Sequence, residues 1–123
     1  MLIEENTFGG EEAAITAYSP GRLEINGQVY TEAVILKENT IEHPAKATPT
    51  EMTAEDFFQT ASNSHPEVIL VGTGEKQIFL HPKIAAALAA KGIGLESMST
   101  AAACRTFMIL QSEGRKVWAW LWP

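Results

Sequence analysis

The fold is decided by residues 68–74, which read Val68-Ile69-Leu70-Val71-Gly72-Thr73-Gly74. Four apolar side chains in succession run directly into a glycine loop. A strand that is apolar on both faces needs cover on both sides, which is typical of a central strand in a layered α/β sheet. We therefore predict that residues 68–71 form the middle of a sheet.

The segments after this loop predict helices alternating with strands. A short strand is expected at residues 77–80, followed by a helix that Pro82 opens and Gly92 closes. Residues 93–98 form the next strand, and Ser99 or Thr100 caps a last helix that runs to about residue 112. Residues 116–122 end the chain as a strand. Helical connections between strands favour right-handed parallel crossovers.

The segments before residue 44 predict an antiparallel meander. Strands are expected at residues 14–18, 22–25, 28–30 and 41–43, and the third of these either ends at Tyr30 or continues through Leu36. Asn26-Gly27 predicts a tight hairpin because both residues tolerate positive φ. Another turn is expected at Glu38-Asn39. Residues 1–12 form a leader that either adds an edge strand or stays mobile.

A linking loop and a short helix separate the meander from the central strand. Residues 44–50 contain two prolines and suit a loop. Thr53 and Asp56 have the spacing of a helix start, although the capping box normally has Glu or Gln at the second position. The helix should end in residues 63–66, because the residue before Pro66 is pushed out of the α region.

Length, charge and cysteine content limit the class of protein. We predict one domain over residues 1–123, which is long enough to bury a core without disulfides. A net charge of −6, with no run of Lys and Arg, argues against a nucleic-acid partner. Cys104 is the single cysteine, so no intrachain disulfide forms and a reducing compartment is indicated. The amino terminus is acidic where a signal or transit peptide is basic, and no apolar run spans a bilayer. We therefore expect a cytoplasmic protein without a membrane span.

The predicted sheet brings two segments together at one edge. Parallel strands end at the same edge, so Gly72, Thr73 and Gly74 should lie near Ser99 and Thr100, at the edge where open α/β sheets bind ligands. Free amides at the start of the last helix favour an anion, and Arg105 adds charge. These residues are our hypothetical ligand-binding site. The alternative is that the glycines only turn the chain and Thr100 only caps the helix.

Sharper chemical motifs are absent from the sequence. The third glycine of a dinucleotide fingerprint, a Walker loop and a nucleophile elbow are all missing. His43, His65 and His81 are isolated and each lies beside or near a proline, so turn or cap roles are favoured over metal binding. We predict no catalytic residue, no metal and no cofactor.

Cysteine and tryptophan each leave two interpretations. Cys104 is either a small core residue or a reactive thiol beside Arg105. Trp118, Trp120 and Trp122 share one face of a regular last strand. They are either core residues or part of a protein interface, where tryptophan is enriched.

Several segments together resemble a known family. They are residues 69–74, 91–98, 100–107 and 113–115, in that order and spacing, with the turns at residues 19–21 and 25–27. The sequence resembles the small α/β domain family of unknown function that includes the mitochondrial respiratory complex I assembly factor 3 and the adipogenesis-associated domain protein. The similarity covers residues 13–123. The positions that match the family pattern are Gly72, Thr73, Gly74, Thr100, Ala103, Thr106, Phe107, Glu113 and Arg115.

The resemblance implies a single-domain, three-layer β/β/α fold. It has a β-hammerhead-like amino-terminal meander followed by a βαβαβ-type mixed sheet with two or three helices. It implies no established enzymatic activity, and the mitochondrial relatives act through protein partners. Ser99 stands where many relatives have Asp, and Met108 where they commonly have Asn. A chemistry that depended on those polar groups would be lost here.

Two functional hypotheses follow from the sequence. The first is a non-catalytic interaction module, similar to an assembly factor, with one or more unidentified protein partners. The second is a small-molecule or anion-binding protein, with catalysis left open, that uses residues 72–74 and the start of the last helix. Homo-oligomerisation is left open.

Overall fold

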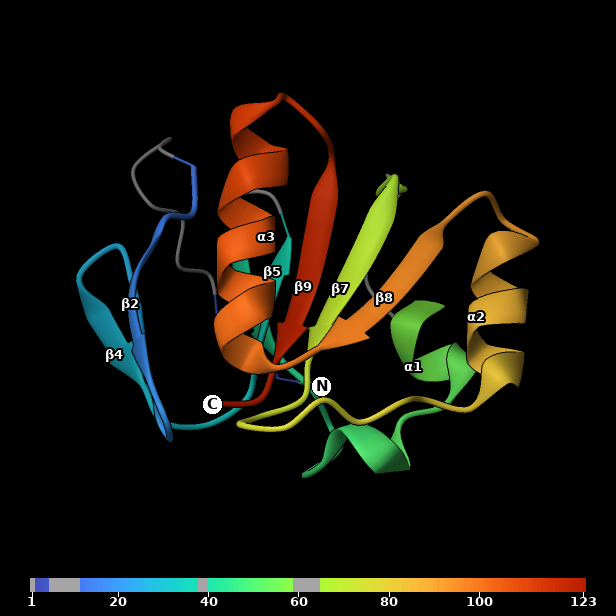
Figure 1. Cartoon of the computed structure of the whole chain (residues 1–123), viewed down its shortest axis with the longest axis horizontal. Coiled ribbons are helices and arrows are strands. Elements are labelled where there is room, and N and C mark those ends of the chain that lie inside the picture. The colour runs from blue at the N-terminus through green and yellow to red at the C-terminus, as the bar shows by residue number, and fades with distance from the viewer. Residues whose placement is uncertain (1, 5–11, 38–39, 59–64) are drawn as a thin grey trace.

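The chain folds around a six-stranded sheet in which β7 (Val68–Gly72) lies between β8 (Gly94–Met98) and β9 (Val117–Leu121) (Figure 1). The computed structural model describes residues 2–4, 12–37, 40–58 and 65–123. β7 pairs in parallel with both neighbours, and all five of its residues are buried. The predicted central parallel strand is confirmed.

The other half of this sheet is antiparallel. β5 (Val34–Lys37) pairs with β9 and with β6 (Thr40–His43), and β1 (Leu2–Glu4) pairs with the outer side of β6. The strand order is β1-β6-β5-β9-β7-β8. Residues 2–4 thus form the edge strand that was one expectation for the leader. Residues 1 and 5–11 of the leader and the turn predicted at Glu38-Asn39 lie outside the described residues.

A smaller antiparallel sheet contains β2 (Ile15–Ser19), β3 (Arg22–Ile25) and β4 (Gln28–Tyr30). Asn26 and Gly27 have φ values of 48° and 84°, as the predicted hairpin turn requires. The expectation that one meander continues through residues 34–43 needs correction, because β5 and β6 belong to the larger sheet. All four residues of β5 are buried, and the middle of the larger sheet covers such a strand on both faces.

The two sheets and the helices form three layers. The small sheet and α3 (Thr100–Ser112) cover one face of the six-stranded sheet, with Leu70 and Phe107 in the core between them. The other face is covered by α1 (Ala54–Phe58) and α2 (Pro82–Ala89), and the 3₁₀ helix η1 (Pro49–Glu51) precedes α1. There Phe57 packs edge-on against Trp120, with ring centroids 4.9 Å apart. The predicted three-layer α/β fold is confirmed.

Both predicted helix starts before α3 have the expected contacts. The Thr53 N–H donates to the Asp56 carboxylate over 2.7 Å, so Asp fills the place that Glu or Gln usually takes in a capping box. His81 precedes α2, and its Nδ1 accepts from the Lys83 N–H over 3.1 Å. The end predicted for the first helix falls within residues 59–64, which lie outside the described residues.

The strand predicted at residues 77–80 does not form. Thr73 Oγ1 accepts from the Ile78 N–H over 3.0 Å and donates to the Lys76 carbonyl over 2.6 Å. These bonds hold the segment across the strand ends as the connection from β7 to α2, and Phe79 is 81% exposed. The β propensity of these residues was therefore overridden by hydrogen bonds between the Thr73 side chain and the backbone of its own loop.

A buried ion pair joins β5 to β6. Lys37 Nζ lies 2.8 Å from Glu42 Oε2, and the side chains are 5% and 8% exposed. Lys37 Nζ also lies 4.9 Å from the ring centroid of Trp118. Burial lowers the pKa of Lys37, and the hydrogen bond and charge of Glu42 act in the opposite direction.

No helix in the described part of the chain is long and apolar enough to cross a membrane.

Candidate functional site

The glycine loop after β7 and the start of α3 lie side by side. The Gly74 N–H donates to Thr100 Oγ1 over 2.8 Å, and the Thr100 N–H donates to the Gly74 carbonyl over 2.8 Å. Thr73 is tied to the end of β8, because its N–H donates to the Met98 carbonyl over 2.9 Å. The predicted proximity of residues 72–74 to Ser99 and Thr100 is confirmed, and ligand binding there stays a prediction.

The hydroxyl groups of this site all have partners within the chain. Thr100 Oγ1 donates to the Trp122 carbonyl over 2.6 Å, in addition to accepting from Gly74. Thr73 Oγ1 is bonded to the loop that follows it, as described above. Ser99 Oγ accepts from the Ala102 N–H over 3.3 Å and so caps α3. Because these groups are occupied, the arrangement stabilises the junction of β7, β9 and α3.

Gly72 permits this close junction. A Cβ at residue 72 would lie 3.0 Å from Thr100 Cα, from Thr100 Oγ1 and from Leu121 Cδ2. Two of these atoms belong to the residue that opens α3, and it is fixed by backbone bonds. The glycine is therefore required for packing at this point.

Gly72→Ala is expected to lower the free energy of unfolding by about 1 to 2 kcal/mol, because the added methyl group overpacks the junction. Gly94→Ala is the matched control. Its Cβ would meet no atom closer than 3.7 Å and its φ is not left-handed. Urea denaturation of both variants checks the prediction, and equal midpoints would contradict it.

A hollow of about 790 Å³ opens beside the glycine loop, at the carboxyl ends of β7 and β9. Its walls come from the loops at residues 31–33 and 43–50 and from Thr73, Gly74, Ile78 and Trp122. The prediction from sequence placed the site at this edge and missed residues 43–50, which form one wall. Their proline-rich composition indicated a loop and carried no signal of where the loop lies.

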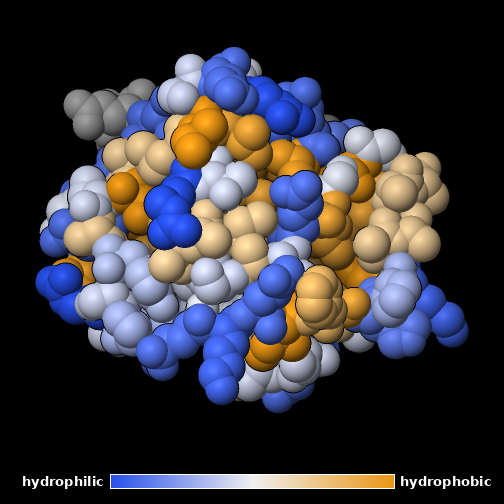
Figure 2. All heavy atoms as spheres, viewed as in Figure 1, coloured by the Kyte–Doolittle hydropathy of each residue, from blue (hydrophilic) through white to orange (hydrophobic). Residues whose placement is uncertain are grey.

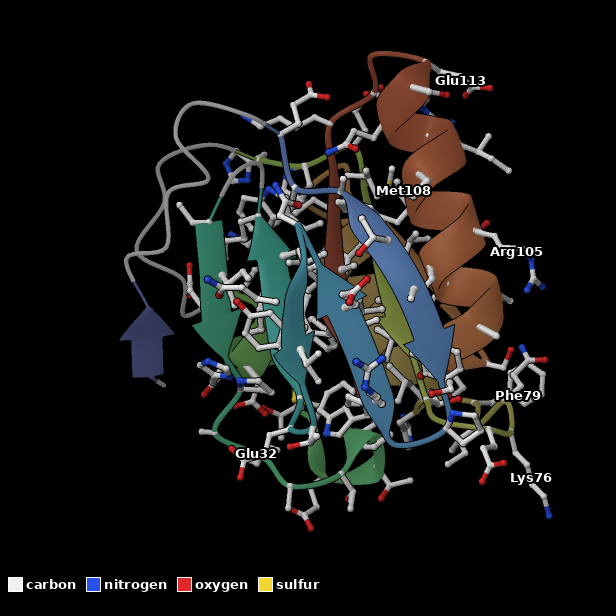
Figure 3. The ribbon with its side chains drawn as sticks, turned by 90° about the vertical axis from the view of Figure 1, so that its left-hand side faces the viewer. Glu32, Lys76, Phe79, Arg105, Met108 and Glu113 are labelled. Atoms are coloured by element: carbon white, nitrogen blue, oxygen red, sulfur yellow. The ribbon has the colours of Figure 1, made fainter. Side chains whose placement is uncertain are left out.

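Few charged groups line this hollow. The Glu32 side chain is exposed at its rim (Figure 3). His43 Nδ1 lies 2.9 Å from the Ala33 carbonyl oxygen. Lys46 Nζ lies 3.4 Å from Asp56 Oδ2, so part of its charge is neutralised. Among the described residues, no three His, Cys, Asp or Glu side chains are placed to hold a metal ion.

Arg105 does not join the glycine loop. Its side chain is exposed on α3 and points away from the body of the protein (Figure 3). It borders a separate hollow of about 500 Å³ between α3 and β2, where Tyr18, Cys104 and Met108 also lie. The structure thus brings together five of the six residues predicted for the ligand site and leaves Arg105 apart.

Cys104 is buried among apolar neighbours on α3. Burial raises the pKa of its thiol to about 11, and the nearby Arg105 charge opposes this rise. The thiolate is the reactive form, so at neutral pH the environment favours the core role over the reactive role.

Iodoacetamide is expected to label Cys104 in the native protein at pH 7.5 at least 100-fold more slowly than in 6 M guanidinium chloride. The native rate should rise about tenfold for each pH unit up to pH 10, since the thiolate fraction rises by that factor below the pKa. Mass spectrometry of timed samples measures both rates. Rapid native labelling at pH 7.5 would support a reactive thiol instead.

The two tryptophans of β9 and Trp122, which follows it, are core residues. Trp118, Trp120 and Trp122 are 3%, 0% and 7% exposed, and all face the layer that contains α1 and α2. None of their indole N–H groups has a hydrogen-bond partner among the described residues. Trp122 also lines the 790 Å³ hollow. The burial of these side chains supports the interpretation as core residues over the interpretation as a protein interface.

Comparison with known proteins identifies the family. The model of the family described as "Protein of unknown function (DUF498/DUF598)" matches residues 15–122. The chain belongs to this family. A protein from Bordetella parapertussis, solved by crystallography, has a similar fold, with a TM-score of 0.84 and 38% sequence identity. The superposition covers 91% of this chain and 96% of that one.

Two relatives have names that describe a cellular location or a function. The "13 kDa major membrane protein" of Francisella tularensis is 30% identical over 101 residues, which are 81% of this chain and 82% of that protein. Assembly factor 3 of the NADH dehydrogenase 1 alpha subcomplex from Mus musculus is 44% identical over 57 residues. That match covers 46% of this chain and 31% of the mouse protein. The resemblance to the family that includes assembly factor 3 is confirmed.

Proposed function

We propose that this chain is a non-catalytic interaction module that binds one or more protein partners, with a role similar to that of an assembly factor. The observation that supports this most directly is the bonding of Ser99, Thr73 and Thr100. A substrate would have to replace short internal bonds, one of them made by the fully buried Thr100, before it gained any of its own.

Two further facts support a protein partner. Phe79 is a large apolar side chain that is 81% exposed in the loop after β7. Aromatic residues are enriched in the centres of protein interfaces. The name of the mouse relative also describes a protein that takes part in assembly of a larger complex.

Site-specific cross-linking in native cells tests this function. A photoreactive phenylalanine analogue in place of Phe79 is expected to give a reproducible adduct with a partner protein. The same analogue in place of Glu113, at the far end of α3 (Figure 3), serves as the control and should give none. Absence of any reproducible adduct from Phe79, together with an unsuccessful pull-down of the wild-type chain, would count against an interaction module.

A second candidate function is binding of a small molecule or anion in the 790 Å³ hollow beside residues 72–74. It is favoured by Trp122, which lines that hollow. The buried indole N–H of Trp122 has no hydrogen-bond partner among the described residues. Thermal shift measurements with phosphate, nucleotides and carboxylates test it. Ala47→Trp, at an exposed position that lines the hollow, should abolish a genuine shift by filling the space.

We propose a cytoplasmic location, because the single cysteine allows no intrachain disulfide and so suits a reducing compartment. The name of the Francisella relative points instead to a membrane fraction. Fractionation of native cells with an antibody to the chain decides between the two, since recovery in the membrane pellet after a high-salt wash would overturn the cytoplasmic placement.

A further inference from the structure

β8 is the last strand of the six-stranded sheet, and only β7 pairs with it among the described residues. The Gly94 N–H donates to the Glu67 carbonyl over 3.0 Å, and the Met98 carbonyl accepts from the Thr73 N–H. These bonds show that the backbone groups of residues 94, 96 and 98 face β7. In a strand the intervening residues face the opposite way.

The backbone groups of Leu95 and Ser97 therefore point toward the open edge. The Ser97 carbonyl confirms this direction, because it accepts from Gln77 Nε2, which lies outside the sheet, over 2.9 Å. A side-chain amide thus occupies a position where a neighbouring strand would donate. The Leu95 carbonyl and both N–H groups remain directed outward along β8.

A hollow lined by both apolar and polar side chains adjoins this open edge. It has a volume of about 540 Å³ and is lined by Phe79, Leu80, Ala85, Leu95 and Met98, among others. Figure 2 shows hydrophobic surface over β8, on the side toward α2. Figure 3 shows the Phe79 side chain projecting outward below the start of α3. Outward backbone groups beside a hollow that can take a side chain are the features that peptide-binding sheet edges use.

We propose that the open edge of β8 binds an extended segment of another protein by strand addition. This inference rests on the proposed function and names the class of partner. A residue opposite Leu95 would lie on the same face as Leu95, which packs in the layer that contains α2, and would enter the hollow. The next residue would lie on the other face, opposite Glu96. The fitting segment therefore alternates apolar and basic residues.

The charge of Glu96 distinguishes this partner from a second copy of the chain. Glu96 is exposed, and two copies paired antiparallel about Glu96 would place like charges directly opposite each other. A shift by two residues, which keeps the same face, would place it opposite Gly94 or Met98, and neither offers an opposite charge. Charged residues on short edge strands oppose self-association. A basic residue in another protein would instead be attracted by the negative charge of Glu96.

Titration of the ¹⁵N-labelled full chain with an acetylated, amidated hexapeptide of alternating Val and Lys tests the inference. The Leu95 and Ser97 amide signals are expected to shift most. Glu96→Lys should weaken binding of this peptide about fivefold and strengthen binding of the matching Val and Glu peptide. Glu113→Lys makes the same change of charge at an exposed site just after α3 and should alter neither affinity.

Backbone pairing is tested by Ser97→Pro, which removes an outward N–H and leaves the bonds to β7 in place. It should weaken peptide binding about fivefold or more. Should this variant misfold, the Val and Lys peptide carrying N-methyl groups on alternate residues provides the same test, because it keeps every side chain and cannot pair with β8 on its methylated side.

Several results would overturn strand addition. They are absence of binding at millimolar peptide, equal binding of the N-methylated peptide, shifts that map away from β8, and a wild-type dimer that Ser97→Pro dissociates. If the Phe79 cross-linking experiment recovers the same partner from wild type and Ser97→Pro, the interaction function stands and the strand-addition site is wrong. If neither this experiment nor the pull-down recovers a partner while the peptide binds as expected, the edge can bind an extended segment and the assembly-type function is wrong.

Discussion

Glu42→Gln is expected to lower the free energy of unfolding by about 3 kcal/mol at neutral pH. Glu42 and Lys37 are both buried, and their charged atoms lie 2.8 Å apart. Glutamine keeps the volume and leaves the Lys37 ammonium without a counter-charge. The expected loss is at the lower end for a broken buried pair, because the face of Trp118 still lies against the ammonium.

The pH dependence identifies the cause of this loss. Burial lowers the pKa of Lys37 in the folded protein, and removal of Glu42 takes away the group that opposes this. The unfolded chain then holds the lysine proton more tightly than the folded chain, so the stability of Glu42→Gln should rise with pH from the folded pKa up to about 10.4.

Matched variants complete this experiment, read by urea denaturation at pH 7 and pH 10. Lys37→Met combined with Glu42→Met should recover most of the stability and show no such rise, because neither buried charge remains. Glu113→Gln, at an exposed position, should change stability by less than about 0.5 kcal/mol. A Glu42→Gln variant as stable as wild type would show that the pair contributes nothing.

Thr100→Val is expected to lower the free energy of unfolding by about 2 to 3 kcal/mol. The hydroxyl of Thr100 is fully buried, donates to the Trp122 carbonyl and accepts from the Gly74 N–H. Valine has nearly the same shape and makes neither bond, so one buried donor and one acceptor lose a partner. The loss therefore reports hydrogen bonding with little change in packing.

Hydrogen exchange and two control variants locate this effect. The Gly74 amide should exchange markedly faster in Thr100→Val, because its acceptor is gone. Thr100→Ser keeps the hydroxyl and should retain the Gly74 protection. Thr106→Val removes a hydroxyl whose contact is the Met98 sulfur at 3.5 Å, and should cost less than 1 kcal/mol. An unchanged exchange rate of the Gly74 amide in Thr100→Val would show that the Thr100 hydroxyl does not hold the glycine loop to α3.

The sequence predicted the parts of the fold that local chemistry determines. β3 and β4 have the predicted bounds because Asn26-Gly27 admits one tight turn between two short strands. β7 was recognisable because its apolar residues leave no polar face. The division of the meander between two sheets was missed, since alternation locates a strand without indicating the neighbour with which it pairs.

The sequence predicted where the candidate site lies and did not predict its hydrogen bonds. Parallel topology sufficed to place Gly74 near Thr100. The Thr100 hydroxyl donates to the Trp122 carbonyl, and nothing in the spacing of those residues predicts this bond. Likewise, Phe79 lies in a segment whose composition predicts a strand, and its exposure follows from Thr73 bonds that only the structure shows. Hydrogen bonds made by threonine hydroxyls thus decided both points.

The place of β9 in the sheet has a consequence for synthesis of the protein. β9 joins the antiparallel half, through β5, to the parallel half, through β7, yet it is the last of these strands to be translated. While the ribosome still holds residues 117–121, the two halves share no strand, and β5 and β7 each present an unpaired edge to solvent. Such nascent chains are the form most exposed to aggregation, so a chaperone that shields β5 and β7 would act during this interval.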